Sequence, residues 1–133
     1  MLRRWIWLLF AASAAVFSIP ALAAEPGSDA AVVHVVLVWL KEPGNPEHRQ
    51  RIIDASREFE TIPGVIDVSV GEVVTSDRPI VDDSFDVGLY LTFFSVDAMN
   101  TYLADGRHQK TLREVFRPLS ERYIVYDFQD AGT

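Results

Sequence analysis

The chain has 133 residues, which is room for one domain of ordinary size. Its 19 acidic and 12 basic residues give a formal net charge of −7 at pH 7, and an acidic surface argues against partners such as nucleic acid or anionic membranes. Cysteine is absent, which excludes disulfides, thiol nucleophiles and thiolate metal sites. The fold must therefore be held by packing alone, or by packing against a second copy of the chain.

The first 23 residues have the three regions of a secretory signal peptide. Arg3 and Arg4 form a basic start, residues 5–19 form an apolar run, and residues 20–23 form a small-residue cleavage site. The alternative, a transmembrane anchor, needs about twenty apolar residues, and this run is shorter. Cleavage would remove two arginines and no acid, which moves the formal charge from −7 to −9. We expect an exported protein, in the periplasm, with no stable membrane insertion after cleavage.

The folded domain is expected over residues 31–129, between a polar linker at 24–30 and a tail at 130–133. Its first element, residues 32–40, is rich in β-branched residues and apolar at both alternating sets of positions. That pattern is typical of a strand covered on both faces, so we expect a central strand.

A helix and an edge strand are expected next. Asn45 and Pro46 supply an N-cap and a proline in the first turn, which predicts a helix start, and Pro63 with Gly64 ends the helix. The second strand is expected over residues 65–74. Its residues alternate between apolar Ile66, Val68 and Val70 and polar Asp67 and Ser69. One face is therefore wet, which favours the edge of a sheet.

The third strand, from Phe85 to Phe93, is expected to be the second central strand. Its odd-numbered apolar residues share one face, and Tyr90 and Phe94 lie on the other. We take Tyr90 and Phe94 as candidate ligand-binding residues. The acidic loop before this strand, residues 75–83, is interpreted as a solvated segment, with a lid over a pocket as the alternative.

Two helices around a break, then a last strand, complete the domain. Ser95 caps a helix that Asp105 and Gly106 interrupt, a further helix ends before Pro118, and residues 123–128 form a strand. The order strand, helix, strand, strand, broken helix, strand predicts an α+β fold with a four-stranded antiparallel sheet. Since the helices can cover only one face, we expect the other apolar face to bury against a second copy in a homodimer.

Five stretches of the chain carry a family pattern: Val33–Leu37, Ile62–Val65, Gly71, Tyr102–His108 and Val125–Phe128. Together they resemble the stress-responsive α/β-barrel domain, the Dabb family, over nearly all of the mature chain. The resemblance implies a ferredoxin-like fold that dimerises into an α/β barrel, with a pocket between sheet and helices in each subunit.

The resemblance also points to site residues. A plant polyketide cyclase of this family uses a Tyr and a His six residues apart, which Tyr102 and His108 match in type and spacing, and His34 matches a first-strand His facing the same cavity. On this view neutral His108 is a general base and the Tyr102 hydroxyl binds a substrate carbonyl. Each residue also has a purely structural interpretation. Tyr102 can be a packed core residue, His108 can start the next helix, and His34 can be a hydrogen-bonded core residue.

Two functions stay open on the sequence. The first is a non-catalytic barrel that binds a small apolar or aromatic molecule or serves in stress, and the second is a cyclase-, isomerase- or monooxygenase-like enzyme using Tyr102 and His108. His34, His48 and His108 lack metal-ligand spacing, and there is no glycine-rich phosphate loop or serine nucleophile elbow. We therefore expect no metal and no cofactor.

Overall fold

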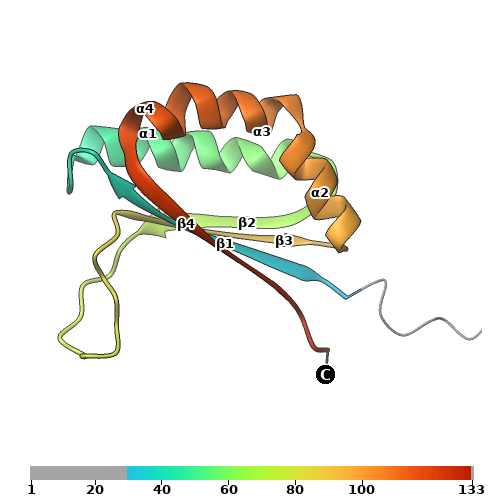
Figure 1. Ribbon diagram of the computed structural model, residues 1–133, viewed down its shortest axis with the longest axis horizontal. Helices are drawn as coiled ribbons and strands as arrows, with labels where there is room; N and C mark the ends of the chain where they lie inside the picture. The colour runs from blue at the N-terminus through green and yellow to red at the C-terminus, as the bar shows by residue number, and fades with distance from the viewer. Residues whose placement is uncertain (1–29, 133) are drawn as a thin grey trace, which may run out of the picture.

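The computed structural model of the protein describes residues 30–132 and has two layers, a sheet and a set of helices on one of its faces (Figure 1). The expected signal peptide, residues 1–23, lies outside the described residues, as does all of the expected linker except Ala30. Within residues 30–132, no helix combines the length and apolar character that crossing a bilayer requires.

The sheet has four antiparallel strands in the order β2-β3-β1-β4. Their bounds are β1 Val32–Leu40, β2 Val65–Glu72, β3 Val87–Phe93 and β4 Ser120–Gln129. The strand order confirms that the first and third strands are central and that the second lies at an edge. It is the expected α+β fold.

The helices cover one face of the sheet only (Figure 1). Their bounds are α1 Pro46–Arg57 with a 3-10 turn Glu58–Thr61 (η1), α2 Val96–Ala104, and a continuous stretch made of α3 Gly106–Thr111, η2 Leu112–Phe116 and α4 Arg117–Leu119. The predicted caps are present, since the Asn45 side chain accepts from two backbone N–H groups of α1 and Ser95 accepts from Ala98.

The last helical stretch continues through Pro118, where the sequence predicted an end. In a regular α-helix the proline ring would clash with the carbonyl of Glu114, four residues earlier. The segment Leu112–Phe116 is a π-helical turn instead, in which the Arg117 N–H donates to the Leu112 carbonyl. The wider turn accommodates the proline, so the helix is distorted at this point and does not stop.

The edge strand β2 also departs from the expected alternation. Ile66 was expected on the buried face, but it is 46% exposed. The pairing of β2 with β3 shifts register between Val65 and Asp67, which indicates a β-bulge at Ile66. The bulge interrupts the alternation of side chains and turns Ile66 away from the buried face. Val68 and Val70 pack against the core as expected.

Strand β3 begins two residues later than predicted because of a buried carboxylate. The Asp86 side chain accepts hydrogen bonds from the backbone N–H groups of Leu40 and Gly44, at 2.9 and 2.7 Å. Phe85, expected on the buried face, packs edge-on against Trp39 instead, with ring centroids 6.3 Å apart. The alternation of β3 therefore starts only at Val87.

The two faces of the sheet differ in how they are covered. Even-numbered residues of β1 and odd-numbered residues of β3 face the helices and form the core. The opposite face, which we call the open face, carries no helix (Figure 1). By the strand register the open face includes these side chains: Val33, Val35, Leu37 and Trp39 of β1, Tyr90 of β3, and Ile124, Tyr126 and Phe128 of β4. The central strands are apolar on both faces, as predicted.

Candidate functional site

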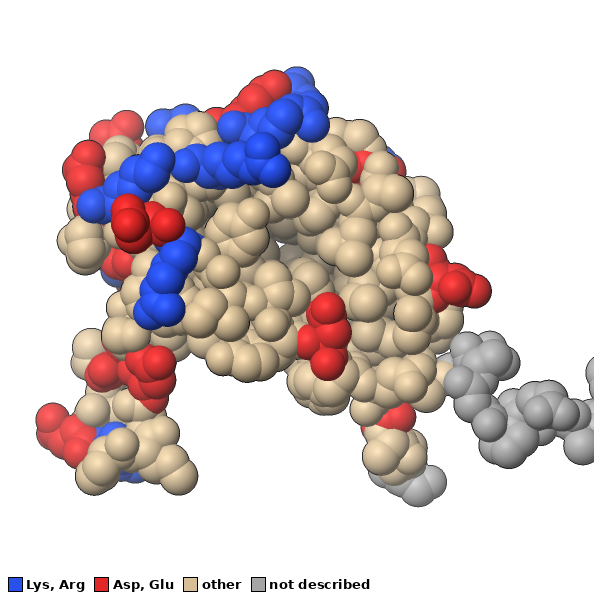
Figure 2. Space-filling model, in the orientation of Figure 1, with Lys and Arg blue, Asp and Glu red and all other residues tan. Residues whose placement is uncertain are grey.

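A cavity of about 160 Å³ lies between the sheet and the helical layer. Its wall is formed by β1, β3 and β4 on one side and by the helices on the other. The lining residues are His34, Val36, Phe59, Leu89, Tyr102, Leu103, His108, Leu112, Phe116, Tyr123 and Val125. Most of these side chains are apolar or aromatic, and polar groups are carried by four residues, His34, Tyr102, His108 and Tyr123. Figure 2 shows a hollow between the two layers on the face in view.

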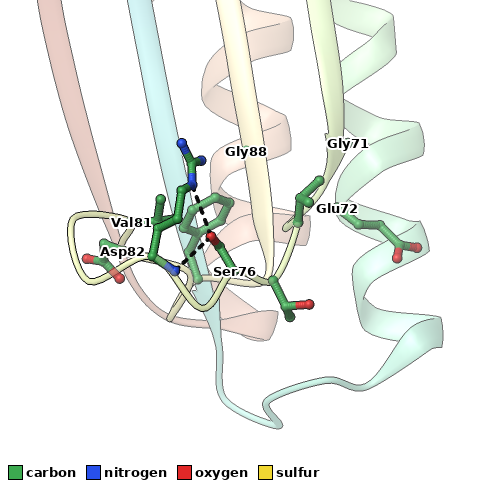
Figure 3. Close-up of a pocket in the computed structure, with 10 residues that line it drawn as sticks. Gly71, Glu72, Ser76, Val81, Asp82 and Gly88 are labelled. Atoms are coloured by element: carbon green, nitrogen blue, oxygen red, sulfur yellow. Dashed lines mark hydrogen bonds between the residues drawn. The ribbon is translucent and has the colours of Figure 1, made fainter.

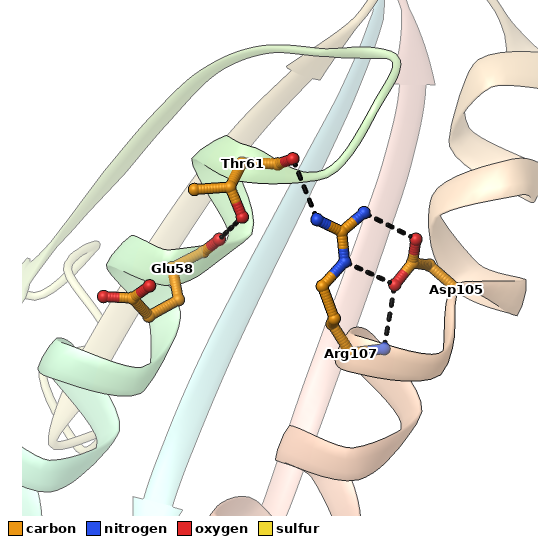
Figure 4. A network of polar contacts seen from close by, with 4 residues as sticks. All are labelled: Glu58, Thr61, Asp105 and Arg107. Carbon is orange, nitrogen blue, oxygen red and sulfur yellow. Dashed lines mark hydrogen bonds and ion pairs between the residues drawn. The ribbon is translucent and has the colours of Figure 1, made fainter.

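The break between α2 and α3 is held by Asp105 and Arg107 (Figure 4). Asp105 ends α2 and caps α3, and its carboxylate accepts from the backbone N–H and the guanidinium of Arg107. These bonds lower the pKa of Asp105 to about 2. The guanidinium also donates to the Thr61 carbonyl at 3.1 Å, which ties the break to η1. The break is therefore fixed in place relative to the first helix.

Tyr102 and His108 meet across this break, as the sequence indicated. Their ring centroids are 4.4 Å apart with an interplanar angle of 43°. Tyr102 is 1% exposed. Its ring also contacts Phe59 edge to face and Phe93 at a tilt, with centroid distances of 5.6 and 5.0 Å. Burial raises the pKa of Tyr102 above its ordinary value, so the phenol is a neutral hydrogen-bond donor at pH 7.

His108 presents one nitrogen to the cavity and uses the other for the backbone. Its Nδ1 lies 3.2 Å from the Leu103 carbonyl oxygen, which can only accept. Nδ1 therefore carries the proton in the neutral ring, and Nε2 holds the lone pair. His108 is 6% exposed, and burial lowers the pKa of its imidazole. The ring is neutral at pH 7, which is the state that a general base requires.

His34 completes the polar wall from the sheet side. Its Nδ1 lies 2.6 Å from Oδ1 of Asp127, which is its direct partner on β4 in the strand register. The carboxylate accepts, so Nδ1 carries a proton and the ring orientation is fixed. The His34 ring centroid is 6.1 Å from that of Tyr102. His34, Tyr102 and His108 thus line one cavity together.

Asp127 was missed at the level of sequence. Its signal was a lone carboxylate within the aromatic segment Tyr126–Phe128, and only the pairing of β1 with β4 shows which residue it faces. Phe59 of η1 lines the cavity as well, with its ring centroid 5.5 Å from that of His108.

Tyr90 and Phe94 are not brought to this cavity. Tyr90 lies on the open face opposite Val35, where it borders a shallow depression, and it is separated from the cavity by the sheet. Phe94 follows the end of β3 and is exposed in the turn before α2. Within residues 30–132, no three His, Asp or Glu side chains are grouped in a way that would hold a metal ion.

We expect His108 to make stability depend on pH below about 6.5. The pKa of His108 is lowered in the folded state by burial, whereas the unfolded chain keeps the ordinary value of about 6.5. As the pH is lowered, the unfolded chain therefore binds the proton before the folded chain does. The free energy of unfolding is highest above about pH 6.5 and falls as the pH drops toward the folded-state pKa. Urea unfolding of the wild type and of His108→Gln, at about pH 8 and about pH 5.5, measures this effect.

The His108→Gln variant should lose less stability than the wild type between the two pH values. Both proteins keep His34, His48 and every carboxylate, so the difference between them reports His108. An equal loss in the two proteins would contradict the assignment of a lowered pKa to His108.

Comparison with solved structures gives the fold of several relatives. A Dabb family protein with a ferredoxin-like fold from Mesorhizobium loti is 21% identical, with a TM-score of 0.64 over 77% of this chain and 99% of that one. A dimeric ferredoxin-like protein of unknown function from Thermobifida fusca is 16% identical, with a TM-score of 0.62 over 77% and 92%. A hydroxynitrile lyase from Passiflora edulis is 22% identical, with a TM-score of 0.63 over 79% and 97%.

These likenesses establish a ferredoxin-like fold that occurs in dimeric proteins. No curated protein matches the chain. A family model does: that of the stress responsive A/B barrel domain, Dabb, matches residues 32–130, which is the whole of the sheet and all of its helices. The chain therefore belongs to the Dabb family of stress-responsive A/B barrel domains.

Proposed function

We propose that the protein is an exported homodimer in which each protomer binds one small, neutral, apolar or aromatic molecule. The observation that carries this proposal is the apolar cavity of about 160 Å³ with the polar groups of His34, Tyr102 and His108 in its wall. The Nδ1 atoms of both histidines are bound to the protein, so each ring has Nε2 to offer a ligand.

The size and charge of the cavity define the ligand class. An apolar protein cavity of about 150 Å³ accepts benzene, so this cavity suits a single ring with a few further atoms. None of the lining residues is a lysine or arginine, so a carboxylate would enter without a cationic partner at a high desolvation cost. The ligand is therefore neutral, and its polar atom is a hydroxyl or a carbonyl.

Two further parts of the proposal rest on other features. The homodimer rests on the apolar open face and on the dimeric Thermobifida fusca relative with the same fold. Export to the periplasm rests on the composition of residues 1–23 alone.

A second candidate function is proton transfer at an enolisable carbonyl compound. It is favoured by the tilted contact between the rings of Tyr102 and His108, with centroids 4.4 Å apart, which places a neutral donor beside a neutral base. His108 Nε2 would take the proton from the carbon next to the carbonyl, while the Tyr102 hydroxyl donates to the carbonyl oxygen. The hydroxynitrile lyase from Passiflora edulis supports an enzyme on this fold.

Binding of benzaldehyde and benzoate, measured by ligand-detected NMR, tests the proposed ligand class. We expect the wild type to bind benzaldehyde and not benzoate. Benzaldehyde only accepts hydrogen bonds, and the donor in the cavity wall is the Tyr102 hydroxyl, so Tyr102→Phe should weaken benzaldehyde binding about tenfold, the equivalent of about one hydrogen bond. His48→Ala, on α1 and outside the cavity wall, should bind like the wild type.

Failure of the wild type to bind benzaldehyde, or equal binding by Tyr102→Phe and the wild type, would overturn the proposal. The enzyme alternative has its own readout, which is deuterium uptake from D₂O at the methyl group of acetophenone. Uptake by the wild type that both His108→Ala and Tyr102→Phe reduce supports proton transfer, and binding without uptake supports the non-catalytic function.

A further inference from the structure

Residues 73–86 form a loop that we call the arm. It connects β2 to β3 and projects from the end of the sheet on the side away from the helices (Figure 1). The cavity lies on the other side of the sheet, so the arm does not cover it. The lid considered for residues 75–83 is therefore not a lid over the cavity of the same protomer.

The arm is held in shape by its own hydrogen bonds. The Ser76 N–H donates to Oδ2 of Asp83 at 2.8 Å, and the Val81 N–H donates to the Arg78 carbonyl at 3.0 Å. The Ser84 N–H and hydroxyl both donate to Oδ1 of Asp82, which lowers the pKa of that carboxyl. An arm that is already ordered loses little conformational entropy when it binds a partner.

Trp39 fixes the base of the arm to the open face. Its indole Nε1–H donates to Oγ of Ser84 at 3.1 Å, and its ring packs edge-on against Phe85. On the open face the guanidinium of Arg122 lies 3.8 Å from the centroid of the same indole ring. The arm, Trp39 and Arg122 therefore form one continuous surface with the open face.

The arm exposes large apolar side chains that nothing in the protomer covers. Ile80 is 91% exposed and Val74 is 82% exposed, more than any other large apolar residue in the described range. Between the arm and the sheet lies a concavity of about 520 Å³, shown in Figure 3, with Val81 on the arm and the paired Gly71 and Gly88 on the open face. This apolar and concave surface has the properties of a protein interface.

The charge of the arm indicates what it contacts. Asp77, Asp82 and Asp83 outnumber the single basic residue, Arg78, and acidic side chains gather on the arm in Figure 2. The open face carries a cation at the end where the arm emerges, Arg122. Arg122 already acts on Asp82 of its own arm, whose pKa it helps to lower, so in a symmetric dimer built on the open faces Asp77 of the other arm would add a further complementary charge.

We propose that the arm is a dimer clasp: each arm packs on the open face of a second copy of the chain, with Ile80 buried and Asp77 beside the partner's Arg122. The inference rests on the proposed homodimer and extends it to an element outside the sheet. The occupant is a second copy because the arm is continuous with the open face and complementary to it in charge.

Sedimentation equilibrium of the wild type and of Ile80→Asp tests the clasp. Ile80 is exposed in the protomer, so the substitution leaves folding intact. Two arms bury two isoleucines in each dimer, so the dissociation constant should rise about a hundredfold or more. Val96→Asp puts the same change on an exposed valine of α2, on the helical side, and should leave the dissociation constant unchanged.

Charge reversal identifies the surface that the arm contacts. Asp77→Lys and Arg122→Asp should each weaken the dimer, and the double variant should recover most of the lost affinity because the pair is restored with reversed sign. An unchanged dissociation constant in Ile80→Asp, or no recovery in the double variant, would overturn the clasp. A monomeric wild type would instead overturn the proposed homodimer itself, so the two failures are distinguishable.

Discussion

Replacing Leu37 with Asp is expected to abolish the proposed homodimer and to leave a folded monomer. Leu37 lies in the middle of the open face, between Gly88 of β3 and Ile124 of β4. In the dimer a carboxylate at this position would be buried without a partner, which costs several kcal/mol at each of two symmetric sites. In the monomer the same carboxylate is accessible to solvent, so the monomer tolerates the substitution better. Light scattering after size exclusion measures the mass.

The matched control for Leu37→Asp is Thr101→Asp on the exposed side of α2, which adds the same charge outside the open face. It should remain dimeric at the same protein concentration. A dimer of Leu37→Asp with wild-type affinity would show that the open face is not the interface. The circular dichroism spectrum of each variant separates loss of the dimer from loss of the fold.

Phe59→Ala is expected to cost about 3–5 kcal/mol of stability, because a buried aromatic ring is lost and the surrounding structure closes only in part. Phe59 is 2% exposed and lies at the centre of the aromatic cluster under the helices. Its ring contacts Tyr102, His108 and Phe116 at centroid distances of 5.6, 5.5 and 6.3 Å. Urea unfolding at pH 7 or above, where His108 is neutral in both states, measures the change.

The same substitution should alter which ligand the cavity accepts. Phe59 is part of the cavity wall, so its removal adds space beside His108 and should raise the affinity for a two-ring carbonyl compound such as naphthaldehyde above that of the wild type. Phe59→Leu keeps most of the side-chain volume and should lose less stability. Equal unfolding free energies for the wild type and Phe59→Ala would contradict the placement of this ring in the core.

The fold was predictable because its strongest signals are local. The β-branched run of β1 is apolar at every position except His34, and such a run is typical of a central strand. Asn45 and Ser95 mark helix starts through side chains that bond the first-turn N–H groups. The break at Asp105 was visible for the same reason, since a carboxylate before a glycine serves as a cap.

The errors come from interactions between distant parts of the chain. Asp86 binds the backbone of Leu40 and Gly44, some forty residues away, and this contact moves the start of β3. The bulge at Ile66 and the π-helical turn before Pro118 each add one residue to a regular repeat, which shifts side chains from their expected face. No periodicity in the local sequence carries that information.

The candidate site was predictable in part for the same reason. Tyr102 and His108 are close in the chain, so the helix break brings them together. His34 was recognised by its position in β1, but its partner Asp127 is 93 residues away and depends on the register of β4. Tyr90 was a candidate ligand-binding residue. Its even position in β3 puts it on the open face, as the alternation of apolar residues in the sequence already indicates.

The segment Tyr126–Phe128 connects the open face to the wall of the cavity. Asp127 points to the helical side and holds His34, whereas Tyr126 and Phe128 on either side of it lie on the open face. In the proposed homodimer, a partner that immobilises these two aromatic rings also immobilises the carboxylate between them. Ligand affinity should therefore rise with protein concentration, and by thermodynamic reciprocity a ligand bound at His34 should tighten the dimer.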